Sequence, residues 1–303
     1  MNPGIDRALY LPSPLAPGEM NRASRTVTSQ GSKGANVAVM LTRLGCDVTY
    51  YSFNGGIYGD VCDRMLESEG VRAVYVPSSC GIRVNTKVID SEGGCTELNE
   101  RGGPFSASEI EALRDAFKGS GADICVLTGS LPSGVSPDFY AALIPVLKAG
   151  GAAVALDCDG KALAEAVRTS PDIIKPNLYE LGGLLKNTGA VSSGSPAGDA
   201  EAVRKKYGIS TVLLTMAGDG SLLVSEGIRD FCPPAKVTLK GFAAAGDCFL
   251  SGYLYAVFER GMSAEDAHLF ASSCGAAKVM LEGTALPDPA DVSALYNSRK
   301  AVR

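Results

Sequence analysis

The chain has 303 residues, of which 46% are hydrophobic and 20% charged, an ordinary composition for a globular protein with an ample core. A net charge of −5 argues against a general nucleic-acid binder, because phosphate backbones require clustered lysines and arginines. No run approaches 18 apolar residues, and the first four residues lack the features of a signal peptide. We therefore expect no membrane partner and a cytoplasmic location.

Nine scattered cysteines and a single histidine limit the available chemistry. The absence of any C-x-x-C pair argues against a zinc site, and an odd count with wide spacing is typical of reduced, mostly buried thiols. His268 falls within a helical pattern, so we expect it to be structural and expect no Ser-His-Asp hydrolase.

Two pairs of segments alternate polar and apolar side chains, namely residues 7–11 with 21–28 and residues 82–89 with 95–99. Such alternation predicts strands with one covered and one open face. Residues 90–94 carry a hairpin signal between the second pair. We expect a small sheet, built from about 7–29 and 82–99, that folds over the site as a lid within a single domain spanning 1–303. An ordinary edge hairpin is the alternative.

From residue 123 onward, apolar strands alternate with helices. The predicted strands are 123–128, 152–157, 172–175 and 211–215, and the predicted helices are 137–149, 161–168, one after Pro176 through Leu185 and one ending near Tyr207. Strands that are apolar on both faces predict a three-layer α/β/α sandwich with a mainly parallel central sheet. Ligands of that architecture bind at the carboxyl ends of strands, where Ser130, Asp157, Lys175, Asn177 and Thr215 fall.

Residues 241–252 combine a turn of small residues, an aspartate at position 247 and a following helical pattern. Such a turn aims unpaired N–H groups and the positive end of the helix dipole at one point, which favours an anion. A carboxylate gains nothing electrostatically from a bound phosphate, so we expect Asp247 to do proton chemistry. An anion site beside a base is what phosphoryl transfer to a hydroxyl requires. A well-capped helix start is the plain alternative.

Further motifs follow in order: Asn2-Pro-Gly-Ile-Asp6, Gly31-Ser-Lys33-Gly-Ala-Asn36, Arg83-Val-Asn85-Thr-Lys87, Lys175-Pro-Asn177-Leu-Tyr-Glu180, Thr215-Met-Ala-Gly-Asp-Gly220 and Ala244-Ala-Gly-Asp247. Together they resemble, over nearly the whole chain, the ribokinase-like carbohydrate kinases of the phosphofructokinase B family. The resemblance implies a ribokinase-like fold and a kinase that uses ATP and Mg²⁺ to phosphorylate a sugar phosphate. Fructose 1-phosphate is the leading substrate, and tagatose 6-phosphate and fructose 6-phosphate are the alternatives. A sugar-phosphate binder that has lost turnover is the alternative outside this class.

The resemblance also implies residue roles. Asp247 would be the general base. The N–H groups of Ala245, Gly246 and Asp247, in the turn that begins at Ala244, would hold the charge that develops on the transferred phosphoryl group. The expected sugar-phosphate ligands are Asp6, Arg22, Gly31, Lys33, Asn36, Arg83 and Ser130. The residues expected at the nucleotide are Lys175, Asn177, Glu180, Thr215, Gly218, Gly220 and Cys274, with Asn177 and Glu180 also helping, indirectly, to organise the metal. For Lys33 and Arg22 a solvated surface position stays open, as does an ordinary first-turn helix carboxylate for Glu180.

Four positions depart from the family pattern. Ala244 replaces a glycine, which costs about 1 kcal/mol if that residue needs positive φ. Ser32 also replaces a glycine, where it would crowd the sugar or bond to it. Ala217 replaces a glycine of the nucleotide turn, where we expect Gly218 to compensate through a shifted turn. Cys248 replaces a serine, and we expect it to serve packing.

Two expectations concern the ends and surfaces of the fold. The family has an apolar strand before the motif that starts at Asn2, whereas this chain begins at the motif. We expect upstream residues to have been omitted, because an interior gap in the sheet would expose strand edges. We also expect a homodimer formed through the lid strands, whose half-open faces would otherwise present apolar side chains to water.

Overall fold

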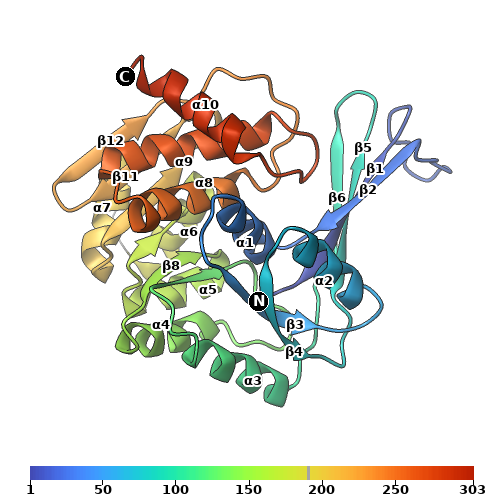
Figure 1. Cartoon of the computed structure of the whole chain (residues 1–303), viewed down its shortest axis with the longest axis horizontal. Helices are drawn as coiled ribbons and strands as arrows, with labels where there is room; N and C mark the ends of the chain where they lie inside the picture. The colour runs from blue at the N-terminus through green and yellow to red at the C-terminus, as the bar shows by residue number, and fades with distance from the viewer. Residues whose placement is uncertain (190–191) are drawn as a thin grey trace.

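The computed structural model describes residues 1–189 and 192–303 and has a three-layered body from which a small sheet projects (Figure 1). The central layer contains strands β7 (Ile124–Thr128), β8 (Ala153–Asp157), β9 (Ile173–Ile174), β10 (Thr211–Thr215), β11 (Ser221–Ser225) and β12 (Ile228–Cys232). Their spatial order is β12-β11-β10-β9-β8-β7. Strands β7 to β10 are parallel, and β11 and β12 extend the sheet with antiparallel pairings.

Helices cover both faces of this sheet (Figure 1). One face carries α1 (Lys33–Arg43), α8 (Ala245–Leu254), α9 (Ala264–Val279) and α10 (Pro289–Lys300). The other carries α3 (Ala107–Lys118), α4 (Phe139–Ala149), α5 (Gly160–Ala166), α6 (Leu178–Thr188) and α7 (Pro196–Tyr207). The remaining helices are α2 (Gly59–Ser68) and the short η1 (Val167–Thr169), η2 (Ala217–Asp219) and η3 (Tyr255–Glu259).

The core divides along the sheet because successive strand residues point to opposite faces. In β8, Ala155 joins the cluster under α1, α8 and α9, whereas Val154 and Leu156 join the cluster under α4 and α5. Both faces are buried, as the sequence predicts for apolar strands without alternation. The α/β/α sandwich is therefore confirmed.

The predicted small sheet is present and projects from the body (Figure 1). Its strands are β1 (Gly4–Tyr10), β2 (Arg25–Gln30), β5 (Arg83–Ile89) and β6 (Cys95–Asn99), in the order β2-β1-β5-β6. The hairpin between β5 and β6 forms as expected, because Oδ1 of Asp90 accepts the N–H groups of Glu92 and Gly94 at 3.0 and 2.8 Å. All five residues of β6 are exposed.

A separate pair of parallel strands, β3 (Thr49–Asn54) and β4 (Arg72–Pro77), was not predicted from the sequence. Helix α2 forms the connection between its two strands (Figure 1). It is not hydrogen-bonded to the six-stranded sheet. Among the described residues, no helix combines the length and apolar character needed to cross a bilayer.

His268 is structural, as expected, although its partners are those of a hydrolase triad. Its Nε2 lies 2.7 Å from Oγ of Ser221, and its Nδ1 lies 2.7 Å from Oδ2 of Asp230. Ser221 and His268 are only 3% and 0% exposed, so no substrate reaches the hydroxyl. The chain of hydrogen bonds instead ties α9 to strands β11 and β12.

Candidate active site

The turn before α8 adopts the conformation that the glycine of the family pattern would favour. Ala244 precedes the helix with φ = 63°, in the left-handed region. The N–H of Ala245 donates to the carbonyl oxygen of Phe242 at 3.3 Å. Contrary to expectation, this N–H is therefore not available to a ligand. Within the described part of the chain, the N–H groups of Gly246 and Asp247 have no acceptor. Two backbone donors, rather than three, are therefore available to an anion.

Asp247 is held at this turn by a residue from a distant part of the sequence. Its carboxyl is buried, and its Oδ2 accepts a hydrogen bond of 2.8 Å from Nδ2 of Asn36 in α1. Burial, and then the nearby charge of Asp157, raise the pKa of Asp247 to about 6, although Asn36 and Lys33 act in the opposite direction. A carboxylate in this range is ionised at neutral pH and still basic enough to accept a proton.

Asp157, at the end of β8, connects the two halves of the site. Its Oδ1 lies 3.1 Å from Nζ of Lys33 and 3.3 Å from Nζ of Lys175, while its buried Oδ2 has no hydrogen-bond partner. Burial alone would raise the pKa of Asp157, but the two ammonium groups lower it overall. The sequence placed Asp157 at the ligand-binding ends of the strands but gave it no specific role. The available signal was its position at a strand end next to that of Lys175.

The two lysines face the start of α8. A Cβ atom on Gly246 would lie 3.2 Å from Nζ of Lys175, so that ammonium group lies directly against the helix start. Burial alone would lower the pKa of Lys33, but the negative charges of the Asp157 and Asp247 carboxylates raise it above the ordinary value. Two cations and two free N–H groups therefore converge, which suits a multiply charged anion.

Lys33 also lines a cavity of about 150 Å³. Arg83 and Ser130 line it together with Lys33, as the resemblance implies for a sugar-phosphate pocket. The Nε of Arg83 is buried without a partner, and burial lowers the pKa of this guanidinium. An unpaired buried N–H is available to an anionic ligand. Asp247 does not line this cavity, but Lys33, which does, is close enough to the Asp247 carboxylate to act on its pKa.

Asp6 and Gly31 meet where β1 and β2 pair. Asp6 accepts hydrogen bonds of 2.9 Å from Nδ2 of Asn85 and from Nζ of Lys87. A Cβ atom on Gly31 would collide with the backbone and carboxylate of Asp6, so the close approach of these strands requires glycine. The roles of Asn85 and Lys87 in fixing Asp6 were missed from the sequence.

One substrate-side expectation finds no support in the structure. Arg22 is exposed on the loop between β1 and β2, at the end of these strands opposite Asp6, and makes no contact with the other predicted ligands.

Ser32, by contrast, lines the 150 Å³ cavity, where its bulk would lie beside a bound sugar. Its Oγ caps α1 by accepting the N–H of Ala35 at 3.2 Å, and it lies 3.2 Å from the hydroxyl of Tyr50. The hydroxyl is therefore already engaged within the protein.

The expected nucleotide turn follows β10. Thr215 ends that strand, and its N–H donates to the carbonyl oxygen of Pro176 at 3.0 Å. Ala217 has φ = 50° and Gly220 has φ = 92°, whereas Gly218 is not in the left-handed region. The expectation that Gly218 compensates through a shifted turn is therefore wrong, since Ala217 itself adopts the left-handed conformation.

Asn177 and Glu180 form a reciprocal cap at the start of α6. Oδ1 of Asn177 accepts the N–H of Glu180, and Oε2 of Glu180 accepts the N–H of Asn177, both at 2.8 Å. Burial raises the pKa of Glu180. Glu180 is thus a helix-start carboxylate, as the alternative interpretation holds. Its part in organising a metal ion stays a prediction. No group of three or more metal-ligating side chains occurs in residues 1–189 and 192–303.

Cys274 does not lie where a nucleotide would meet its side chain. The thiol is fully buried in α9 and packs against Gly252 of α8, where no larger residue than glycine fits. This placement argues against the predicted contact and explains the residue through helix packing. Cys248 is likewise fully buried, as expected for a packing residue.

Comparisons with known proteins identify the family. The model of the pfkB family carbohydrate kinases matches residues 1–291. A 1-phosphofructokinase of Haloferax volcanii is 30% identical over 96% of this chain and 93% of its own length, and that of Rhodobacter capsulatus is 31% identical over 97% and 93%. Phosphofructokinase-2 of Escherichia coli, solved in complex with potassium, superimposes with a TM-score of 0.92 at 24% identity, covering 99% of this chain and 97% of that one.

The family match and these relatives indicate a phosphotransferase that acts on a hydroxyl acceptor. The chain belongs to the pfkB family of carbohydrate kinases. Membership implies ATP as the phosphoryl donor. The ribokinase-like fold is also supported by a ribokinase of Thermotoga maritima, which superimposes with a TM-score of 0.78 at 22% identity over 98% of this chain and 97% of that one.

Proposed function

We propose that this protein phosphorylates fructose 1-phosphate to fructose 1,6-bisphosphate, with ATP as donor and Asp247 as general base. The observation that carries the proposal is a carboxylate whose pKa is raised to about 6, placed beside two free backbone N–H groups and two lysines. The choice of sugar rests on the relatives, several of which are 1-phosphofructokinases.

Proton transfer is the first contribution of the site. Asp247 accepts the proton of the sugar hydroxyl as that oxygen attacks the γ-phosphorus of ATP, and the bond from phosphorus to the bridging oxygen breaks to release ADP. The hydrogen bond from Asn36 fixes Oδ2 of Asp247 and leaves Oδ1 for the hydroxyl. The proton then leaves Asp247 to solvent after the product departs.

Charge stabilisation is the second contribution. The N–H groups of Gly246 and Asp247 face the position where negative charge develops, and preorganised donors of this kind are typically worth about 3–4 kcal/mol each. Lys175 adds its charge at the start of the same helix. Lys33 and Arg83 line the cavity where the phosphate already on the sugar would bind.

Mg²⁺ fits the chemistry of the donors, since hard cations prefer oxygen ligands. The unpartnered Oδ2 of Asp157 and the carboxylate of Glu180 are the oxygen donors that would hold the ion, directly or through water. The ion would neutralise charge on the phosphate oxygens of ATP.

An initial-rate comparison tests the proposal. Purified protein is given Mg·ATP with fructose 1-phosphate, tagatose 6-phosphate or fructose 6-phosphate, and ADP release is followed. We expect the highest kcat/KM for fructose 1-phosphate, and a higher value for either other sugar would reassign the substrate. No ADP release with any of them, with tight calorimetric binding of fructose 1-phosphate, would instead identify a sugar-phosphate binder.

We further propose that the protein works as one domain whose small sheet acts as a lid and joins two copies in a homodimer. Val27 of β2 and Leu98 of β6 are 41% and 61% exposed, so the sheet presents apolar side chains to solvent. A dimeric mass in light scattering at micromolar concentration is expected, and Leu98→Lys should shift it toward the monomer. A monomeric parent protein would contradict the proposed assembly.

A further inference from the structure

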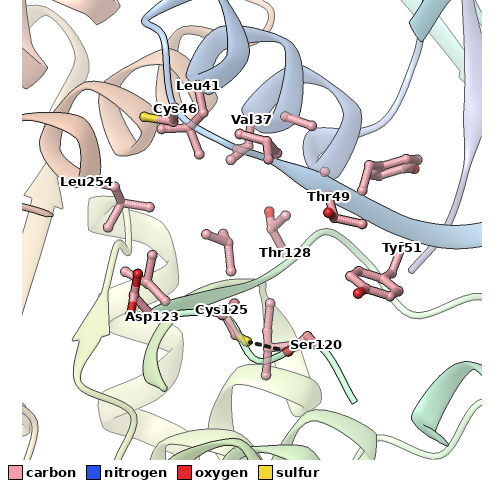
Figure 2. A pocket seen from close by; sticks show the side chains of 18 of the residues that line it. Val37, Leu41, Cys46, Thr49, Tyr51, Ser120, Asp123, Cys125, Thr128 and Leu254 are labelled. Carbon is pink, nitrogen blue, oxygen red and sulfur yellow. Dashed lines mark hydrogen bonds between the residues drawn. The ribbon is translucent and has the colours of Figure 1, made fainter. Parts of the chain in front are cut away.

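The two ends of helix α8 are supported by different parts of the molecule. Leu254, its last residue, lines a cavity of about 650 Å³ together with Val37 and Leu41 of α1 (Figure 2). No residue of the turn at 241–247 is among those that line this cavity in the described part of the chain. The contacts that hold the start of the helix, and with it Asp247, are therefore found elsewhere.

One such contact involves a lysine to which the proposed reaction gives no role. The side chain of Lys278, at the C-terminal end of α9, is fully buried. Its Nζ donates hydrogen bonds of 3.0 Å to the carbonyl oxygen of Gly283 and of 3.4 Å to that of Leu281. Among the described residues no carboxylate pairs with it, and burial lowers its pKa. Because a buried charge is costly, a lysine kept here without an acidic partner indicates a specific task.

The positive charge of Lys278 is stabilised by dipoles rather than by an opposite charge. Carbonyl oxygens are good ligands for a small cation, and the end of α9 contributes the negative end of its dipole. Conversely, two carbonyl oxygens directed at one point repel each other, so the cation also keeps these two groups together. Removing the charge should therefore allow the loop that carries Leu281 and Gly283 to open.

The carbonyl groups that bind this ammonium lie against the chain segment that leads to Asp247. A Cβ atom on Gly241 would lie 2.8 Å from the carbonyl oxygen of Leu281 and 3.3 Å from that of Gly283, so the close approach requires glycine. The N–H of Gly241 also donates to the carbonyl oxygen of Val279 at 3.3 Å. The loop thus fixes the chain shortly before the turn that opens α8.

The same loop also contacts the small sheet. Oγ1 of Thr284 is hydrogen-bonded to Oγ of Ser29 in β2. Strand β2 pairs with β1, which carries Asp6. One short loop therefore touches both the segment before the proposed general base and the sheet that carries a proposed sugar ligand.

We propose that the ammonium group of Lys278 is a built-in cation that holds the loop at 281–283 against Gly241 and thereby keeps the free N–H groups of Gly246 and Asp247 in position for the phosphoryl group. This inference rests on the proposed function, because it makes Lys278 a positioning residue for that reaction. Lys278 acts through the two carbonyl groups that it binds and not by touching the substrate.

Lys278→Met tests the proposal, because methionine keeps the apolar stem and leaves only the place of the nitrogen empty. In a buffer free of alkali-metal ions, we expect kcat to fall at least about tenfold. Ammonium chloride should restore most of the loss in a saturable manner, whereas tetramethylammonium chloride at the same ionic strength should not. The parent protein should not respond to ammonium, because its site is filled. Lys300→Met, which removes an exposed lysine paired with Asp266, is the control and should change kcat less than about twofold.

Three outcomes of this experiment overturn the proposal. The first is an unchanged kcat in Lys278→Met, and the second is a loss that ammonium does not restore, which would assign Lys278 to packing. The third is activation of the parent protein by ammonium, which would mean that the lysine does not fill the site.

Hydrogen exchange separates this proposal from the proposed function. In Lys278→Met the segments 240–248 and 278–285 should exchange at least about tenfold faster than in the parent protein, and ammonium should slow them again. This result is expected whether or not the protein phosphorylates a sugar, and unchanged exchange contradicts the role of Lys278. If the variant folds only in ammonium chloride, the proposal is equally supported. A variant that stays unfolded in both salts makes Lys278 a general folding residue and overturns it.

Discussion

Nδ2 of Asn36 donates a hydrogen bond of 2.8 Å to Oδ2 of Asp247, and so α1 fixes the carboxylate that α8 presents. The two residues are 211 positions apart in sequence. This bond favours the ionised form of Asp247 and opposes the effect of its burial. The balance between burial and hydrogen bonding sets the basicity of the proposed general base.

Activity should depend on the ionisation of Asp247. Because the pKa of this group is raised to about 6, kcat/KM should fall about tenfold per pH unit below that value and level off above it. A pH–rate profile between pH 4.5 and 8 measures this limb. Asp247→Asn should lower kcat by at least about 10²-fold, and an unchanged kcat would remove Asp247 from the mechanism.

The same group should affect stability in the opposite sense to an ordinary carboxylate. Its folded pKa of about 6 exceeds the unfolded value of 3.8, so the native state binds more protons between these values. The free energy of unfolding therefore contains a contribution that falls as pH rises from about 4 to 6. Asp247→Asn lacks this contribution and should be more stable than the parent protein at pH 7.5 in urea titrations.

Removing the Asn36 donor should disfavour the ionised form of Asp247. Asn36→Ala should raise the pKa of Asp247 and move the acid limb of kcat/KM upward by about one pH unit. Ser251→Ala is a suitable control in the same helix contact, because its hydroxyl bonds only to backbone oxygens of Val37 and Asp247. If the acid limb of kcat/KM does not move in Asn36→Ala, Asn36 does not set the pKa of the general base.

Asp157 should be the most sensitive charged position in the site. Asp157→Asn would leave the ammonium groups of Lys33 and Lys175 without their buried partner, and we expect a loss of about 3–5 kcal/mol in the free energy of unfolding. The exposed neighbour Asp159 provides the control, and Asp159→Asn should change stability by less than about 0.5 kcal/mol. Urea denaturation of the three proteins gives both values.

Ala244 offers a stabilising change. Its left-handed φ of 63° is strained for alanine, and Ala244→Gly should gain about 0.5–1 kcal/mol after the greater chain entropy of glycine is subtracted. Ala245→Gly, one residue later in the first turn of α8, should instead lose up to about 1 kcal/mol. Opposite shifts in Tm for these neighbours would confirm the strain, and equal shifts would refute it.

Arg83 should not tolerate lysine if it binds the phosphate on the sugar. Arg83→Lys removes the planar fork, and we expect KM for the sugar phosphate to rise at least about tenfold while KM for ATP stays unchanged. Arg25→Lys alters an exposed pair with Glu282 and should leave both KM values within about twofold. Equal effects of the two substitutions on sugar KM would argue against the assignment.

Sequence reasoning reached the main elements of the central sheet because apolar runs and turn residues are local signals. The predicted strand 211–215 coincides with β10, and the helix predicted through Leu185 continues to Thr188 in α6. The pair β3 and β4 was missed. Its residues alternate only weakly, and tertiary packing under α1 and α2 decides their conformation.

The sequence by itself determined the α/β/α architecture and supplied most of the candidate site residues, because periodicity, strand ends and short motifs are properties of neighbouring positions. Only the tertiary structure decided which of those residues meet. It placed Asp157 between two lysines, left Arg22 on an exposed loop and buried Cys274 between helices. It also raised the pKa of Asp247. Such effects depend on burial and on charges brought together from distant segments, which no local pattern records.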